Sequence, residues 1–158
     1  MKTPITRAGY ERLVEELQRL KEERPRISQA IGVAREHGDL RENAEYHAAK
    51  DRQGIVEARI AQLEEVVGTA EIIDPATLSG DKVAFGARVT VVDGETGQRS
   101  AYIIVGEHES DATRGHISLK SPIARALMTK SVGTVVEVST PRGDRELEIV
   151  EVTYSYTL

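Results

Sequence analysis

Apolar residues between positions 13 and 67 recur at helical spacing, in two stripes separated by a polar interval. Successive members of the first stripe stand four, three, seven, four and three residues apart, which places them on one narrow face of an α-helix: Leu13, Leu17, Leu20, Ile27, Ile31 and Ala34. Steps of the same kind join Ala49, Val56, Ile60, Leu63 and Val67. Polar residues fill the remaining faces, so each stripe needs a partner, and the simplest partner is the other stripe.

The polar interval, "HGDLREN" at residues 37–43, carries signals for the end of one helix and the start of another. His37 and Gly38 are typical of a helix C-terminus. Asp39 is a favoured N-cap, and Glu42 follows three residues later, as in a capping box. The pattern predicts an antiparallel helical hairpin with about 30 residues in each arm and arms roughly 45 Å long. Pro25 predicts a kink or short break near residues 23–26, because proline cannot donate a backbone hydrogen bond.

The helical period stops within "IIDPATLSGDKVAFG", residues 72–86, which predicts a hairpin domain over residues 1–75 and a globular domain over residues 76–158. Five short segments rich in β-branched residues follow, and turn sequences separate them: residues 87–93, 100–106, 116–120, 134–140 and 146–152. They predict a small, mainly antiparallel sheet. "SPIARALMTK" predicts one short helix over a face of that sheet, with Ser121 as the cap and Pro122 at the first helical position. The expected fold class is α+β.

Composition narrows the possible functions. The 158 residues include no cysteine and no tryptophan, so the core must be aliphatic, and disulfides and thiolate zinc sites are excluded. No apolar run approaches the roughly 20 residues of a membrane span, and no signal peptide is evident, so we expect a soluble, cytoplasmic protein with no membrane partner. A net charge of -5 argues against broad electrostatic binding of duplex nucleic acid, so any nucleic-acid contact should be local.

The two acids of the polar interval admit two explanations. Asp39 and Glu42 are the residue types that a helix start prefers, and capping alone would account for their spacing. Two carboxylates at the end of an exposed hairpin can also bind a hard cation such as Mg²⁺, provided that a partner supplies the other oxygen ligands. The two roles are compatible, since a cap uses only part of a carboxylate's capacity to accept hydrogen bonds.

Other polar residues give weaker indications. Lys50 and Arg52, in "HAAKDRQG", could contact a phosphate, but their alternation with Asp51 favours a solvated helix face. The four histidines offer no third ligand at a spacing typical of zinc sites. The sequence contains no glycine-rich phosphate loop, no nucleophile elbow and no Cys-His arrangement, so we expect no self-contained enzyme site.

Two longer stretches resemble a known family. Residues 34–54, "AREHGDLRENAEYHAAKDRQG", resemble the signature of the bacterial Gre transcript-cleavage factors, and residues 121–138, "SPIARALMTKSVGTVVEV", resemble their second motif. The resemblance extends to "TRAGYERLVEELQRLK" near the start and "LEIVEVTY" near the end, and so covers the whole chain. Within the family, the acidic balance is closer to the branch whose hairpin carries the smaller basic patch.

The resemblance implies a coiled-coil hairpin followed by an FKBP-like domain that binds bacterial RNA polymerase near its secondary channel. The hairpin would enter that channel and stimulate the polymerase's own cleavage of nascent RNA in backtracked complexes, so the chain itself is not expected to be an enzyme. Asp39 and Glu42 match the two functional acids of the family. Their implied role is to help hold a second, weakly bound Mg²⁺ and to orient the attacking water, with polymerase aspartates and RNA phosphate as the other ligands.

The resemblance also implies roles for other residues. Lys50 and Arg52 match positions that contact the extruded RNA 3′ end, and Arg41 is basic like its family counterpart. Ser121 and Pro122 match a loop that contacts the polymerase, whereas Ile123 and Leu127 are expected in the core. We expect a monomer, because a paired hairpin needs no second copy.

Three alternatives remain open from the sequence. The first is an inhibitory relative that occupies the same channel without promoting cleavage, although such relatives carry an altered acidic tip and "GDLREN" is unaltered here. The second is a coiled-coil adaptor or chaperone whose acids only cap a helix. The third is an autonomous nuclease, for which the sequence supplies too few metal ligands.

Overall fold

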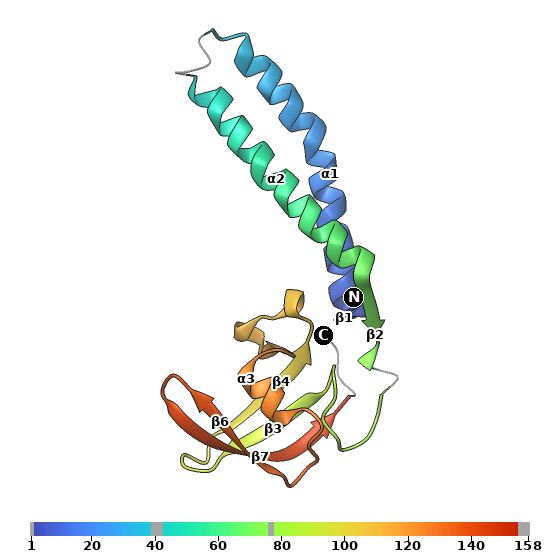
Figure 1. Ribbon diagram of the computed structural model, residues 1–158, viewed down its shortest axis with the longest axis vertical. Helices are drawn as coiled ribbons and strands as arrows, with labels where there is room; N and C mark the ends of the chain where they lie inside the picture. Colours follow the sequence, from blue (N-terminus) through green and yellow to red (C-terminus); the bar gives the residue numbers. More distant parts are fainter. Residues whose placement is uncertain (1, 39–42, 76–77, 155–158) are drawn as a thin grey trace. The chain divides into compact units, whose positions relative to one another are not determined.

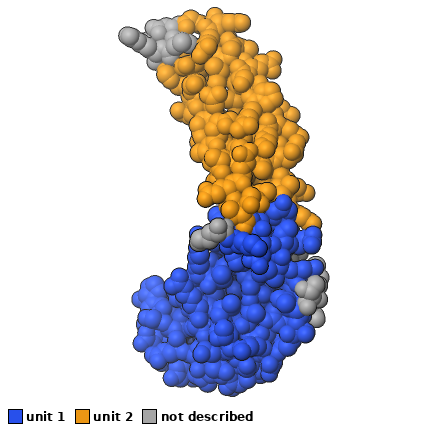
Figure 2. Space-filling model, turned by 45° about the vertical axis from the view of Figure 1, so that its right-hand side comes forward, with its two compact units in different colours: residues 1–10, 70–158 blue, residues 11–69 orange. Residues whose placement is uncertain are grey.

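The computed structural model describes residues 2–38, 43–75 and 78–154. Contacts divide the chain into two compact units, Glu11–Thr69 and a second unit that combines Met1–Tyr10 with Ala70–Leu158, coloured separately in Figure 2. The division at residue 75 stays a prediction, because compactness alone does not show which segment folds independently. No helix in the described ranges is both long and apolar enough to cross a bilayer.

Two antiparallel helices form the predicted hairpin (Figure 1). Helix α1, Arg7–Arg35, has 29 residues, and helix α2, Ala44–Thr69, has 26. The two apolar stripes meet between them, in a cluster that joins buried residues of both helices to partly buried neighbours: Ile27, Ile31, Val56 and Ile60 with Leu17, Leu20, Tyr46 and Ala49. The hairpin is therefore confirmed, and its seam is confirmed except at the last position, where Val66 is buried and the predicted Val67 is only partly buried.

The predicted short break at Pro25 does not occur. Helix α1 continues through Pro25 without interruption. Leu20 on one side of the proline and Ile27 on the other pack into the same apolar cluster, and Arg24 pairs with Glu57 of α2. These contacts hold both halves of α1 against one partner, which outweighs the single backbone hydrogen bond that proline cannot make.

Five strands form one sheet in the order β5-β4-β3-β7-β6. They match the five predicted segments: β3 Arg88–Asp93, β4 Arg99–Val105, β5 His116–Ser118, β6 Val135–Thr140 and β7 Gly143–Thr153. Strands β3 and β4, β3 and β7, and β6 and β7 pair antiparallel, whereas β4 and β5 pair parallel. The mainly antiparallel sheet is thus confirmed.

Helix α3, Pro122–Leu127, packs on this sheet as predicted. Ala124 and Leu127 are fully buried and join the apolar side chains of the strands in one core. The Ser121 hydroxyl caps α3 by accepting a hydrogen bond from the Ala124 N–H at 3.2 Å. Two short 3-10 helices, Glu107–Glu109 and Ala112–Arg114, connect β4 to β5.

A second, two-stranded sheet was not predicted. Strand β1, Thr3–Thr6, pairs parallel with strand β2, Ala70–Ile73, immediately before α1 and immediately after α2. Each strand has only four residues. Such short segments do not show the alternation of apolar and polar residues by which a strand is recognised in a sequence.

A buried carboxylate secures the start of α1. Glu109 is 8% exposed, and its carboxylate accepts hydrogen bonds from the Thr6 N–H at 3.0 Å, from the Gly106 N–H at 2.8 Å and from the Thr6 hydroxyl. The Thr6 hydroxyl in turn accepts from the Gly9 N–H at 3.1 Å, and so acts as a helix cap. Together these bonds fix β1 and the first turn of α1 to the segment that follows β4.

Candidate functional site

The candidate site is the end of the hairpin, where α1 and α2 stop. Asp39, Arg41 and Glu42 lie outside the described residues, so the site is built here from its two flanks. Helix α1 ends at Arg35, two residues before the predicted end, and Gly38 has the positive φ of 111° that favours glycine. The Glu36 and His37 N–H groups donate to the carbonyls of Val33 and Ala34, both at 3.1 Å, which tightens the last turn.

Helix α2 begins at Ala44, not directly after Asp39 as predicted. Asn43 supplies the cap: its side-chain oxygen accepts a hydrogen bond from the Tyr46 N–H at 3.0 Å. Its amide nitrogen also donates to the carbonyl of Ala34, which ties the start of α2 to the end of α1. The cap of α2 is thus Asn43, and the roles of Asp39 and Glu42 stay predictions.

An aromatic residue closes the apolar seam beside this end. Tyr46 is half-buried against the apolar cluster between the helices. The Arg35 guanidinium lies 6.0 Å from the centroid of its ring, and the His47 ring packs edge-on to it at 5.6 Å. The residues that bracket positions 39–42 are therefore held in place from both helices.

Removal of the Asn43 side chain should weaken the contacts between α1 and α2 at this end of the hairpin. Asn43→Ala is expected to lower the free energy of unfolding of the hairpin by about 1 kcal/mol, through loss of the cap. Asn43→Asp keeps the cap acceptor but cannot donate to Ala34, so it should lie between the wild type and the alanine variant. Thermal unfolding followed by circular dichroism at 222 nm measures the effect, and equal stability of all three proteins would contradict the assignment of the cap.

The structure gives Arg52 a partner that the sequence did not reveal. Its Nε and Nη2 donate to the two carboxylate oxygens of Glu23 at 2.7 and 2.9 Å, which joins α2 to α1. Lys50 is exposed, and its Nζ donates to the Gln53 side chain of the same helix at 3.1 Å. The RNA contacts of Lys50 and Arg52 stay predictions. An alignment of the two apolar stripes in antiparallel register could have placed Arg52 opposite Glu23.

Arg52 and Glu23 belong to a ladder of four ion pairs across the hairpin. The other three join Glu16 to Arg59 at 2.6 Å, Arg24 to Glu57 at 2.8 Å and Lys21 to Glu64 at 3.2 Å. Hydrogen bonds from the arginines lower the pKa of three of the carboxyls below their usual range: Glu16, Glu23 and Glu57. These carboxyls stay charged at neutral pH.

The ladder predicts a specific dependence of hairpin stability on pH. A carboxyl whose pKa is lower in the folded than in the unfolded state stabilises the fold above the unfolded value, here 4.5, and this contribution is lost as the pH falls through the folded pKa. A variant with Glu16→Gln, Glu23→Gln and Glu57→Gln should melt about 3 °C below the wild type at pH 7, and the difference should shrink as the pH falls below 4.5.

A matched control uses three exposed glutamates that form no ion pair with any residue in the described ranges. The variant with Glu11→Gln, Glu15→Gln and Glu65→Gln should show little change at either pH. A deficit of the ladder variant that stays constant from pH 7 to pH 3 would show that the ion pairs do not cause it.

The predicted polymerase-contact residues lie at the start of α3. Pro122 is exposed and Ser121 is half-buried, with its hydroxyl engaged in the cap of α3. Leu127 is fully buried and Ile123 packs against the same core, as expected. The polymerase contact of Ser121 and Pro122 stays a prediction.

Within residues 2–38, 43–75 and 78–154, no group of three histidine or acidic side chains is arranged to hold a metal ion. His37 and His47, which flank the candidate site, are exposed. The metal-binding roles of Asp39 and Glu42, which lie outside the described residues, stay predictions.

Comparison with known proteins covers both halves of the chain. Residues 3–72 match the family model described as "Transcription elongation factor, N-terminal", and residues 78–154 match "Transcription elongation factor, GreA/GreB, C-term". The chain is 53% identical to "Transcription elongation factor GreA" of Rickettsia canadensis, over 97% of this chain and 95% of that protein. It is 56% identical to the protein of the same name from Alkalilimnicola ehrlichii, over 98% and 99% of the two chains.

A solved structure is also similar over nearly the full length. The "Crystal structure of GreA factor homolog 1 (Gfh1) protein of Thermus thermophilus" is 31% identical, covers 96% of this chain and 99% of that chain, and superposes with a TM-score of 0.45. The family assignment rests on the sequence matches. Since these cover the hairpin and the sheet unit alike, the chain belongs to the GreA/GreB family of transcription elongation factors.

Proposed function

We propose that this chain stimulates bacterial RNA polymerase to cleave nascent RNA in backtracked complexes, which restarts arrested elongation. The observation that carries the proposal is the match of both halves to the GreA/GreB family, with the motif of residues 34–54 at the end of a two-helix hairpin. The chain acts on the polymerase's own activity and is not itself an enzyme. As a partner of bacterial RNA polymerase, it acts in the cytoplasm.

The hairpin is suited to reach a site that a globular protein cannot enter. At 1.5 Å per residue, helices of 29 and 26 residues give arms of about 40 Å. The apolar seam and four ion pairs hold the arms together along their length. Such a hairpin fits the proposed entry into the polymerase's secondary channel, with residues 39–42 at the leading end.

The chemistry of Asp39 and Glu42 fits a Mg²⁺ ion shared with the polymerase. Carboxylate oxygens are hard ligands of the kind Mg²⁺ prefers, but two side chains leave most of an octahedral shell to be filled by other groups. A bound Mg²⁺ would supply positive charge to activate water and to stabilise the leaving oxygen. The part of this chain is to supply two carboxylates at the end of a hairpin whose two helices are joined there by the contacts of Asn43 and Tyr46 with Ala34 and Arg35.

For contact with the extruded RNA, Lys50 is the stronger candidate of the two basic residues on α2. Lys50 is exposed, and among the described residues its ammonium group has one partner, the neutral side-chain amide of Gln53. Arg52 would have to give up a two-bond ion pair with Glu23 before it could bind a phosphate. Arg41 is proposed to contribute positive charge beside the acids, and Ser121 and Pro122 to contact the polymerase.

The proposal is tested with a backtracked elongation complex of bacterial RNA polymerase that carries 5′-labelled RNA. Addition of the chain at physiological Mg²⁺ should shorten the RNA and then allow elongation to resume when nucleotides are supplied. Inhibition of elongation without cleavage would instead identify a channel-occupying inhibitor. Cleavage of the same RNA without polymerase would identify an autonomous nuclease.

A further inference from the structure

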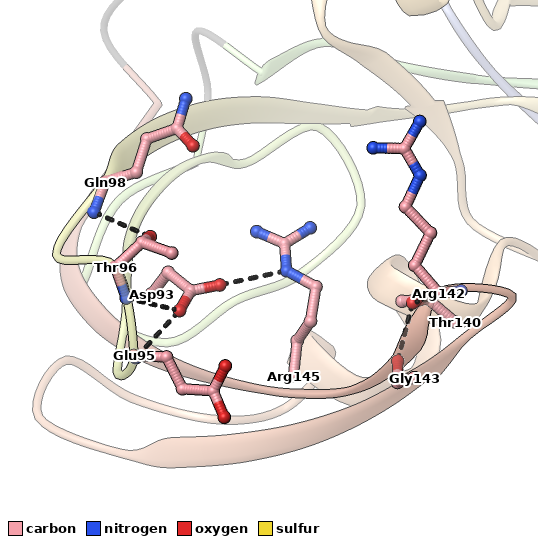
Figure 3. Close-up of polar contacts among 8 residues, drawn as sticks. All are labelled: Asp93, Glu95, Thr96, Gln98, Thr140, Arg142, Gly143 and Arg145. Carbon is pink, nitrogen blue, oxygen red and sulfur yellow. Dashed lines mark hydrogen bonds and ion pairs between the residues drawn. The ribbon is translucent and has the colours of Figure 1, made fainter.

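A pocket lined mostly by charged and polar residues lies at one end of the five-stranded sheet, between two turns that are far apart in the sequence (Figure 3). One turn joins β3 to β4 and the other joins β6 to β7. The pocket has a volume of about 550 Å³, and its lining includes Asp93, Glu95, Gln98, Thr140, Arg142 and Arg145. Neither turn contains a residue assigned above to RNA, metal or polymerase binding.

A buried carboxylate fixes one of the two arginines. Asp93 is 7% exposed, and its carboxylate accepts hydrogen bonds from the Glu95 N–H at 2.8 Å, the Thr96 N–H at 3.1 Å and Arg145 Nε at 3.0 Å. The Thr96 and Glu95 backbone groups, followed by Arg145, hold the pKa of Asp93 below its usual range, so this anchor stays charged. A guanidinium has five N–H donors, so Arg145 keeps donors beyond those used by Asp93 and Tyr102.

The second arginine, Arg142, stands in the turn between β6 and β7, whose backbone is fixed by hydrogen bonds. The Thr140 hydroxyl donates to the Gly143 carbonyl at 2.6 Å and accepts from the Arg142 N–H at 3.3 Å, and Gly143 has a positive φ of 116°. Within the ranges that the structure describes, the Arg142 side chain forms no hydrogen bond or ion pair. Both guanidinium groups point to the same side of the two turns in Figure 3.

We propose that the pocket between Arg142 and Arg145 is a docking point for an acidic side chain of a partner protein. Guanidinium groups bind carboxylates through pairs of charge-assisted hydrogen bonds, and Arg145 is already oriented by Asp93. Because Asp93 already orders Arg145, only the Arg142 side chain would lose conformational freedom on binding. The proposal does not depend on RNA cleavage.

The charges around the pocket favour a single carboxylate over a nucleic-acid backbone. Two acids, Asp93 and Glu95, offset the two arginines among the lining residues, and Glu95 makes no ion pair with any described residue. Glu146 approaches Gly94 of the same turn and adds a further negative charge nearby. Binding to nucleic acid depends on a local excess of cations over many phosphates, which this surface lacks.

The test uses nuclear magnetic resonance on the full chain at low ionic strength. A blocked Gly-Glu-Gly peptide should shift the Arg142 and Arg145 Nε–Hε signals saturably, with a dissociation constant on the order of 1 mM. The matching Gly-Gln-Gly peptide should not shift them. Equal shifts with both peptides, or none with either, would overturn the proposal.

Three variants and a second probe sharpen the test. Arg142→Gln should weaken binding of the acidic peptide about 5-fold, and Glu95→Gln should strengthen it about 2-fold, because a like charge is removed. Arg88→Gln, an exposed change on β3 outside the pocket, should have no effect. An Arg142→Gln affinity equal to the wild type would overturn the proposal. So would an oligoribonucleotide that shifts the same signals at lower concentration than the peptide, because it would identify a nucleic-acid site.

Discussion

Asp39→Asn and Glu42→Gln are each expected to lower the rate of stimulated RNA cleavage about 100-fold, while binding to the polymerase survives. Each change keeps the size of the side chain and one oxygen acceptor but removes the negative charge that would help to hold Mg²⁺ and orient water. The residues that support the hairpin end are unchanged: Asn43 still caps α2, and Tyr46 still closes the seam. The variants therefore test the role of the two carboxylates in cleavage without a change in the stability of the hairpin.

Cleavage rates are measured with 5′-labelled RNA in backtracked complexes over a range of Mg²⁺ concentrations. Higher Mg²⁺ should restore part of the rate, because the variants weaken the shared metal site. Glu45→Gln is the matched control, since Glu45 is an exposed acid in the first turn of α2 and should be dispensable. Full cleavage activity of both the Asp39→Asn and the Glu42→Gln variant would show that the two carboxylates are not needed for stimulated cleavage.

Gly9→Ala is expected to lower the free energy of unfolding by about 3 kcal/mol, although alanine is the better helix former. A Cβ at this position would overlap the Glu109 carboxylate and would lie 2.6 Å from its Cγ. Glu109 cannot move aside without loss of its hydrogen bonds to Thr6 and Gly106. The destabilisation would come from buried N–H groups left without an acceptor.

A reversal of sign tests this explanation. In a Glu109→Ala background the obstructing carboxylate is absent, so Gly9→Ala should there be neutral or stabilising by up to about 1 kcal/mol. Gly32→Ala, in the same helix with open space around the added methyl group, should stabilise by a similar amount. Denaturant unfolding measures the wild type and the four variants: Gly9→Ala, Glu109→Ala, the double variant and Gly32→Ala. A similar destabilisation by Gly9→Ala in both backgrounds would rule out Glu109 as the cause.

The parts of the fold that repeat a local pattern could be predicted from the sequence. The two helical stripes, the five strands and the cap of α3 each depend on residues close together in the chain. Strands β1 and β2 were not predicted because they pair with each other across the whole length of the hairpin. Thr3, for example, lies opposite Ala70. The hydrogen bond from Thr6 to Glu109 joins residues 103 positions apart, so no local sequence pattern could predict it.

At the candidate site, prediction failed where two local signals competed. Asp39 and Asn43 are both good caps, and the structure begins α2 after Asn43 because the Asn43 amide also reaches the end of α1. The break predicted at Pro25 does not occur because α1 packs against α2 on both sides of the proline. Arg52 forms an ion pair with Glu23 of the facing helix. In each case a contact between the helices decided the outcome.

The central claim is that the hairpin end acts beside the RNA 3′ end, and photo-crosslinking tests it most directly. Backtracked complexes would carry 4-thiouridine at the RNA 3′ terminus, and crosslinks to this chain would be mapped by protease digestion and mass spectrometry. The account predicts crosslinks within residues 34–54 that disappear when the complex is not backtracked. Crosslinks confined to residues 78–154, or none in a complex that cleaves its RNA on addition of the chain, would contradict it.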